Sequence, residues 1–189
     1  KPDKSTVFID LPEDITSEIL QYCHKTRNTV TGFMAEVFRK PNTKVAVTTD
    51  LRRRLGLPYA ACGNLSCGIV FNEKEIVTGD TIKRKIAGND DLKQLIAVLN
   101  TSPEGVIAGV LAYNAAANRN GYQLAISNLG MQPLEDSARC LYFVPPAVPD
   151  SLSIGMVTCN GVMTMVLASH RPVDITKDDV ISKLKEAMV

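Results

Sequence analysis

The sequence predicts a mixed α/β domain in which helices cover a β-sheet, and three local patterns support this fold class. Some segments place apolar residues at every second position, which is typical of strands. Others place them three and four residues apart, which is typical of amphipathic helices. Asn160-Gly161 separates two β-rich runs and predicts a tight antiparallel hairpin. Strands and helices mixed in this way along one chain favour a layered α/β (α+β) architecture.

The chain opens with one strand and two helices. Alternating apolar residues over 5–11 predict a half-buried strand. A helix opens at 12–14, where acidic residues suit the positive end of the helix dipole, and breaks at 28–29. A second apolar stripe over 30–38 predicts another helix, which ends before a proline.

The middle of the chain contains two strands around a loop, followed by a long helical stretch. Alternation over 44–49 and an apolar run over 67–71 predict the strands, and the small residues and glycines between them predict a loop long enough to be functional. Asp80 is expected to cap a helix over 81–100. Gly88-Asn89-Asp90 should divide that helix in two.

The remaining elements follow from the same reasoning, although the glycines after Pro103 weaken the helical pattern there. In order, they are a helix over 103–117, strands over 122–127, 141–144 and 152–158, a strand over 162–168 that completes the hairpin, and a closing helix that begins at Asp174 or Thr176.

Composition limits the classes of function. The chain has 189 residues, 45% of them hydrophobic, which suits a globular α/β domain with its own core. A formal net charge of +1 gives no field that would attract nucleic acid or anionic lipid. No apolar run is long enough to span a membrane. The five cysteines are odd in number and scattered, and no secretory leader is evident, so we expect thiols in a cytoplasmic setting.

Few residues carry a recognisable chemical signature. His24 and His170 lack a local nucleophile or orienting group, and the Cys62/Cys67 spacing does not fit a zinc site, so no metal is expected. Arg52 and Arg54 could bind the phosphates of a nucleotide or coenzyme A, because guanidinium groups pair with phosphate oxygens. A solvated or salt-bridged strand end explains these arginines equally well.

Two segments with flexible backbone and side-chain amides could approach a ligand closely. Gly63-Asn64 lies in the long loop, and Ser127-Asn128-Leu129-Gly130 follows a predicted strand. Ordinary turn chemistry accounts for both segments as well. The residues alone therefore indicate an α/β domain without its own catalytic constellation.

The order of these features resembles the C-terminal domain of condensation domains and of related alcohol and polyketide-associated acyltransferases. These proteins belong to the chloramphenicol acetyltransferase (CAT)-like superfamily. The pieces that carry the resemblance are 11–38, 45–55 with Asp50 and the three arginines, Gly63-Asn64, Ser127-Asn128-Leu129-Gly130, and the closing strand pair and helix over 152–188.

The resemblance implies that residues 1–189 form one of the two domains of that fold, a mixed sheet covered by helices. It implies transfer of an acyl group from a coenzyme A or carrier-protein thioester to an alcohol, or less readily to an amine. The thioester is the donor substrate, and no tightly bound cofactor is expected. Asn64, Ser127, Asn128 and Gly130 would lie near the substrate channel, with Arg52 and Arg54 as donor-binding candidates.

The family's catalytic motif, His-His-x-x-x-Asp-Gly, is absent from this chain. We therefore expect no catalytic residue here and no activity without an N-terminal domain that carries the motif, which becomes the expected partner. His170 and Asp174 have the four-residue spacing of the motif but no following glycine, and they remain the alternative pair. The sheet side facing the partner should be unusually apolar.

Two other functions remain open. The chain could be a non-catalytic module of the same fold that binds a ligand or a carrier protein. It could also be an unrelated α/β domain that binds a small molecule.

Overall fold

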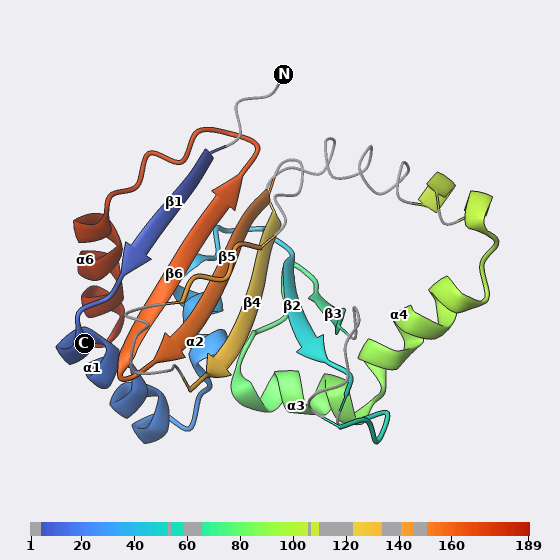
Figure 1. Cartoon of the computed structure of the whole chain (residues 1–189), viewed down its shortest axis with the longest axis horizontal. Helices are drawn as coiled ribbons and strands as arrows, with labels where there is room; N and C mark the ends of the chain where they lie inside the picture. The colour runs from blue at the N-terminus through green and yellow to red at the C-terminus, as the bar shows by residue number, and fades with distance from the viewer. Residues whose placement is uncertain are drawn as a thin grey trace.

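A single six-stranded mixed sheet organises the chain in the computed structural model, with strand order β1-β6-β5-β4-β2-β3 (Figure 1). The structure describes residues 5–52, 54–58, 66–105, 107–109, 123–133, 141–145 and 151–189. The strands are β1 (Ser5–Asp10), β2 (Val45–Asp50), β3 (Ser66–Phe71), β4 (Gln123–Met131), β5 (Ser151–Cys159) and β6 (Val162–Ser169).

The centre of the sheet is parallel and its two sides are antiparallel. β4 pairs in parallel with β5 on one side and with β2 on the other. β6 runs antiparallel to both β5 and β1, and β3 runs antiparallel to β2. As a result β2 and β4 end at the same edge of the sheet, whereas β6 ends at the edge where β4 and β5 begin.

Helices α1 (Glu13–Lys25), α2 (Val30–Phe38), α3 (Gly79–Ala87) and α6 (Lys177–Ala187) lie on one side of the sheet, and α4 (Asp90–Leu99) leads away beside β3 (Figure 1). Thr29 and Thr176 cap α2 and α6 through their side chains. The cap of α3 is Thr78, whose hydroxyl accepts from the Thr81 amide, so the predicted cap at Asp80 is wrong. The predicted break at 88–90 is confirmed.

The hydrophobic core lies between this helical layer and the sheet. Every second strand residue points into it, for example Val45 and Val47, Leu124 and Ile126, Met165 and Leu167. The helices contribute Ile19, Phe33, Ile82, Val180 and Leu184, all of them buried. This alternation explains why the apolar patterns predicted the strands and helices correctly.

The Asn-Gly hairpin between β5 and β6 is confirmed. Asn160 and Gly161 both adopt positive φ, at 48° and 80°, as a type I′ turn requires. β5 is buried at every position, and β6 at every position after Val162, because they lie in the middle of the sheet.

The sheet face opposite the helices is partly covered by residues 141–145. The Leu141 carbonyl accepts from the Thr164 hydroxyl, and the Tyr142 ring meets Phe8 edge-on at 5.3 Å. Gly155 allows this close approach, because a Cβ there would lie 2.2 Å from the Phe143 carbonyl oxygen. These residues pair with no strand, so the strand predicted over 141–144 is wrong.

Small and hydroxyl-bearing side chains dominate this second face, hereafter the open face. Within the described strands its only charged residues are Asp10 and Asp50. The other members are Thr6, Phe8, Ala46, Thr48, Ser66, Gly68, Val70, Gln123, Ala125, Ser127, Ser151, Ser153, Gly155, Val157, Cys159, Val162, Thr164, Val166 and Ala168. The described part of this face therefore mixes apolar and hydroxyl-bearing side chains and lacks a dense charge, and the expectation that it is unusually apolar stays a prediction.

Two further points concern the elements. Residues 103–105 and 107–109 are helical, and the rest of the helix predicted over 103–117 falls outside the described residues. No helix in the described ranges is long and apolar enough to cross a membrane.

Candidate functional site

The predicted substrate-binding segment lies where β2 and β4 run side by side toward the same edge of the sheet. Ser127 and Asn128 occupy successive positions of β4, and successive strand residues point to opposite faces. Ser127 therefore lies on the open face, whereas Asn128 points toward the helical layer. The two residues that the sequence grouped together thus line different sides of the sheet.

Ser127 meets a partner that the sequence analysis missed. Its hydroxyl lies 2.7 Å from the hydroxyl of Thr48, which faces it from β2. Thr48 is exposed and Ser127 is partly exposed, so this hydroxyl pair is open to a ligand on the open face. Such a pair can both donate and accept hydrogen bonds. The only signal in the sequence is that both residues follow apolar strand cores, which does not reveal that the strands are neighbours.

Asn128 shapes the end of β4. Its Oδ1 accepts a hydrogen bond of 2.8 Å from the Gly130 amide, and the β4–β5 register shifts between Asn128 and Met131. Gly130 has a φ of 72°, which a residue with a side chain adopts only at a cost. The Asn128 Nδ2 lies 3.4 Å from the hydroxyl of Thr31 in α2, at the long end of hydrogen-bond geometry. Turn chemistry therefore explains part of the Asn128–Gly130 pattern.

Arg52 follows β2 at the same sheet edge and is held by Asp50. Its amide and its Nη1 each lie 3.0 Å from the Asp50 Oδ1. The pKa of Asp50 lies below its ordinary value, chiefly because the Arg52 amide donates to the carboxylate, with a further contribution from the guanidinium. The Asp50 side chain is half exposed, so Arg52 and Asp50 form a surface ion pair. A ligand phosphate could replace the Asp50 carboxylate beside Arg52 at little cost in free energy.

Arg54 has a different environment, in which its donors serve the junction between α3 and α4. Its Nη1 and Nη2 donate to the Ile86 carbonyl and the Asn89 side chain. Its Nε lies 3.7 Å from the Oδ2 of Asp91, a carboxylate with no solvent exposure. Among the described residues this oxygen accepts no hydrogen bond, so Arg54 is the cation that balances a buried charge there.

The other predicted site residues are placed elsewhere or fall outside the described part. Asn64 lies outside the described residues. His170 follows the end of β6, at the edge where β4 begins, and so lies away from Asn128 and Gly130. Asp174 is exposed in the segment between β6 and α6 and lines a cavity that His170 does not line. No group of three metal-ligating side chains occurs among the residues that the structure describes.

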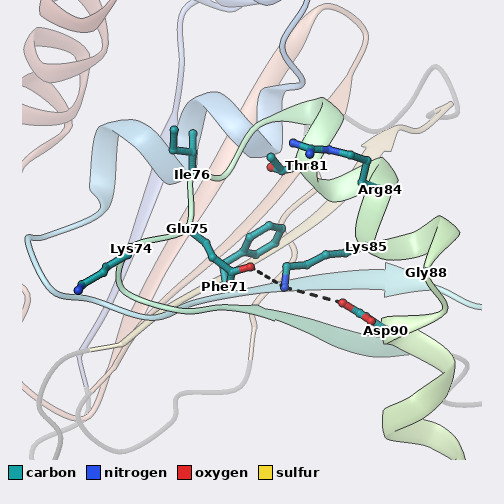
Figure 2. A pocket seen from close by; sticks show the side chains of 9 residues that line it. All are labelled: Phe71, Lys74, Glu75, Ile76, Thr81, Arg84, Lys85, Gly88 and Asp90. Atoms are coloured by element: carbon teal, nitrogen blue, oxygen red, sulfur yellow. Dashed lines mark ion pairs between the residues drawn. The ribbon is translucent and has the colours of Figure 1, made fainter.

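A cavity of about 500 Å³, which the sequence analysis did not anticipate, lies between the end of β3 and α3. Figure 2 shows Lys85 reaching between Glu75 and Asp90, at 2.9 and 3.8 Å, while its ammonium lies 5.0 Å from the Phe71 ring centroid. The pKa of Glu75 is lowered, first by a hydrogen bond from the Asn72 amide and then by Lys85. Through these two ion pairs Lys85 joins the 72–76 loop to α3 and α4.

Comparison with known proteins identifies the fold. No protein-family model matches the sequence, and no curated protein matches it. Among solved structures, the chain is similar to the protein described in the "Molecular basis for condensation domain-mediated chain release from the enacyloxin polyketide synthase". The TM-score is 0.52 at 13% identity, over 100% of this chain and 40% of that one.

Two further structures agree. The epimerization domain from the third module of tyrocidine synthetase B gives a TM-score of 0.51 at 10% identity, over 98% of this chain and 47% of that one. A four-domain nonribosomal peptide synthetase bound to AMP and glycine gives 0.53 at 13% identity, over 98% and 17%. The chain thus spans less than half the length of each of these proteins. The chain therefore has a fold like that of these condensation and epimerization domains.

Proposed function

We propose that this chain forms the C-terminal half of an acyltransferase that moves an acyl group from a coenzyme A or carrier-protein thioester to an alcohol. The observation that carries the proposal is the Thr48–Ser127 hydroxyl pair on the open face, in a sheet with the condensation-domain fold. In this proposal the open face forms one wall of the substrate channel. A second domain supplies the other wall and the catalytic histidine.

The chemistry assigns the proton transfers to that second domain. The acceptor hydroxyl oxygen attacks the thioester carbonyl carbon, the carbon–sulfur bond breaks, and the proton passes through the histidine base to the leaving thiolate. The chain itself contributes positioning. Ser127 and Thr48 would hydrogen-bond a substrate, and Arg52 is suited to a phosphate of the donor because its partner Asp50 is solvent-accessible.

The test uses the enzyme assembled with its motif-bearing domain. Thiol release from acyl-coenzyme A and from an acyl-N-acetylcysteamine thioester is followed in the presence of an alcohol acceptor. Ser127→Ala should lower kcat/KM by about two- to tenfold, the worth of one neutral hydrogen bond. The matched control is Thr6→Ala, which removes an exposed hydroxyl from the same face three strands away. Equal activity of both variants and the wild type would remove Ser127 from the site.

Asn128→Asp separates a site role from a turn role. The substitution keeps an oxygen that accepts from Gly130, loses the long Nδ2 contact with Thr31 and adds a negative charge at a partly buried position, so the free energy of unfolding should fall by about 1–2 kcal/mol. If Asn128 lies at the channel, activity of the assembled enzyme should fall further than stability does. An unchanged turnover would leave Asn128 with the turn role alone.

A non-catalytic module that binds a carrier protein or small ligand is the second candidate. It is favoured by the sequence, which contains no His-His-x-x-x-Asp-Gly motif, and by the separation of His170 from the Ser127 region. The thiol-release assay distinguishes the binding module from the acyltransferase, because a binding module would bind a carrier protein without releasing thiol.

A further inference from the structure

A second pocket lies at the edge of the sheet opposite Asn128 and Gly130, and none of the functions above uses it. It has a volume of about 320 Å³ and is called here the α2–α6 pocket. Its lining consists of Phe38, Lys40, Ser151, Leu152, Ser169, Arg171, Pro172, Val173, Asp174, Ile175 and Lys183. The volume is at the lower end of the range for small-molecule sites.

The position of the pocket follows from the strand register. Ser169 ends β6 and pairs with Leu152 near the start of β5, while β4 and β5 begin side by side at Gln123 and Ser151. The pocket therefore lies where the parallel strands begin. The candidate channel segment lies where β4 ends, so a ligand in the pocket would not contact it.

The inner wall of the pocket is apolar. Phe38 and Leu152 are buried members of the core, and Val173 and Ile175 are half-buried against it. A site that combines such walls with a few polar groups is the usual form of a small-molecule pocket, because the apolar surface provides affinity and the polar groups fix orientation.

The rim of the pocket carries the ammonium group of Lys183, and Lys40, Arg171 and Asp174 line it as well. The Lys183 ammonium lies 5.6 Å from the centroid of the Phe38 ring, so this cation sits directly above the apolar wall. An anionic group bound there would meet positive charge next to an apolar surface.

A buried hydroxyl adds a polar group to the pocket. Ser169 is 6% exposed, and its Oγ accepts a 3.1 Å hydrogen bond from the Arg171 amide. A serine hydroxyl can also donate, and within the described ranges no residue accepts its proton. A carboxylate oxygen would satisfy that donor.

We propose that the α2–α6 pocket binds a small amphiphilic carboxylate. The carboxylate group pairs with Lys183 and accepts from Ser169, and the hydrocarbon part lies on Phe38 and Leu152. The proposal is independent of acyl transfer, because the pocket is separate from the Ser127 region.

The test is calorimetric titration of the whole chain with octanoate as the probe. Octanoate should bind with one-to-one stoichiometry. Binding should weaken as sodium chloride is raised from about 50 to about 300 mM, since salt screens exposed charges. Lys183→Gln should weaken binding at least fivefold. The matched control is Lys185→Gln, which removes an exposed lysine of the same helix that does not line the pocket. Circular dichroism checks that both variants fold.

Two further probes make the result decisive. 1-Octanol lacks the charge and should bind at least fivefold more weakly than octanoate. Inorganic phosphate lacks the apolar part and should not displace octanoate at equal concentration. Equal binding of octanoate to the two lysine variants, or no binding at all, would overturn the site. If phosphate at equal concentration displaces bound octanoate, the proposal that the ligand is amphiphilic is overturned.

Discussion

Replacing Arg54 tests whether this arginine has a structural role at the α3–α4 junction. The structure pairs its Nε with the fully buried carboxylate of Asp91 and occupies its Nη1 and Nη2 with Ile86 and Asn89. Arg54→Gln therefore leaves a buried charge without its cation. Arg52→Gln is the matched control, because Arg52 pairs with the half-exposed Asp50.

The two substitutions should lower the free energy of unfolding by different amounts. Removing one partner of a buried ion pair lowers it by about 3–5 kcal/mol, and the partial exposure of Arg54 reduces this loss to about 2–4 kcal/mol. The exposed Arg52–Asp50 pair contributes about 0–1 kcal/mol. For a chain of this size, each kcal/mol corresponds to about 2–4 °C in the unfolding midpoint. Arg54→Gln should thus lower the midpoint by roughly 5–15 °C, and Arg52→Gln by less than about 4 °C.

The assay is urea and thermal unfolding followed by circular dichroism, since the sequence contains no tryptophan. Asp91→Asn in the Arg54→Gln background should recover part of the loss, because it removes the unbalanced charge. If Arg54→Gln is no less stable than Arg52→Gln, the structural role is refuted. A donor-binding role for Arg54 would instead appear as a raised KM for acyl-coenzyme A in the assembled enzyme.

Three other perturbations test separate parts of the structure. Gly155→Ala should lower the free energy of unfolding by about 1–3 kcal/mol, because the new methyl group overpacks against residues 141–145. Ser153→Ala, on the same face, should change it very little because the Ser153 hydroxyl has no hydrogen-bond partner within the described ranges, and equal stability of the two variants would refute the contact. The pKa of Glu75 is lower in the folded state than in the unfolded state, so ionised Glu75 stabilises the folded state. This contribution is complete above the unfolded pKa, about 4.3, and is lost as the pH falls through the folded pKa. Glu75→Gln should weaken the acid dependence of the unfolding midpoint, and an identical pH profile would contradict this. Burial raises the pKa of Cys23 to about 11, so iodoacetamide at pH 8 should alkylate Cys23 more slowly than the partly exposed Cys67. Peptide mass spectrometry measures both rates, and equal rates would contradict the burial of Cys23.

The elements that the sequence predicted well depend on local chemistry. Asn160-Gly161 specified the hairpin because only a few residue types adopt positive φ in succession. The core strands were predictable because their apolar residues alternate. The errors occurred where a distant partner decides the outcome. Residues 141–144 have the composition of a strand, but they lie across the open face, where no strand edge is available.

The candidate site was harder to predict than the fold. Ser127 could be singled out as a strand-end residue, but its contact with Thr48, 79 positions earlier, depends on the parallel pairing of β2 and β4. Asn128 was grouped with Ser127, yet strand alternation turns it to the other face. Arg54 was a phosphate-binding candidate because its partner Asp91, which lies in α4 and 37 positions further along the chain, is not recognisable as a neighbour from the sequence.

The central claim is that this chain works as one half of a two-domain acyltransferase. The most direct test is intact mass spectrometry of the native preparation, under denaturing and non-denaturing conditions, combined with the thiol-release assay. The account predicts that a domain bearing His-His-x-x-x-Asp-Gly accompanies these 189 residues, covalently or as a second polypeptide, and that the assembly releases thiol from an acyl thioester only when an acceptor is present. A preparation that contains this chain alone and releases no thiol would contradict it.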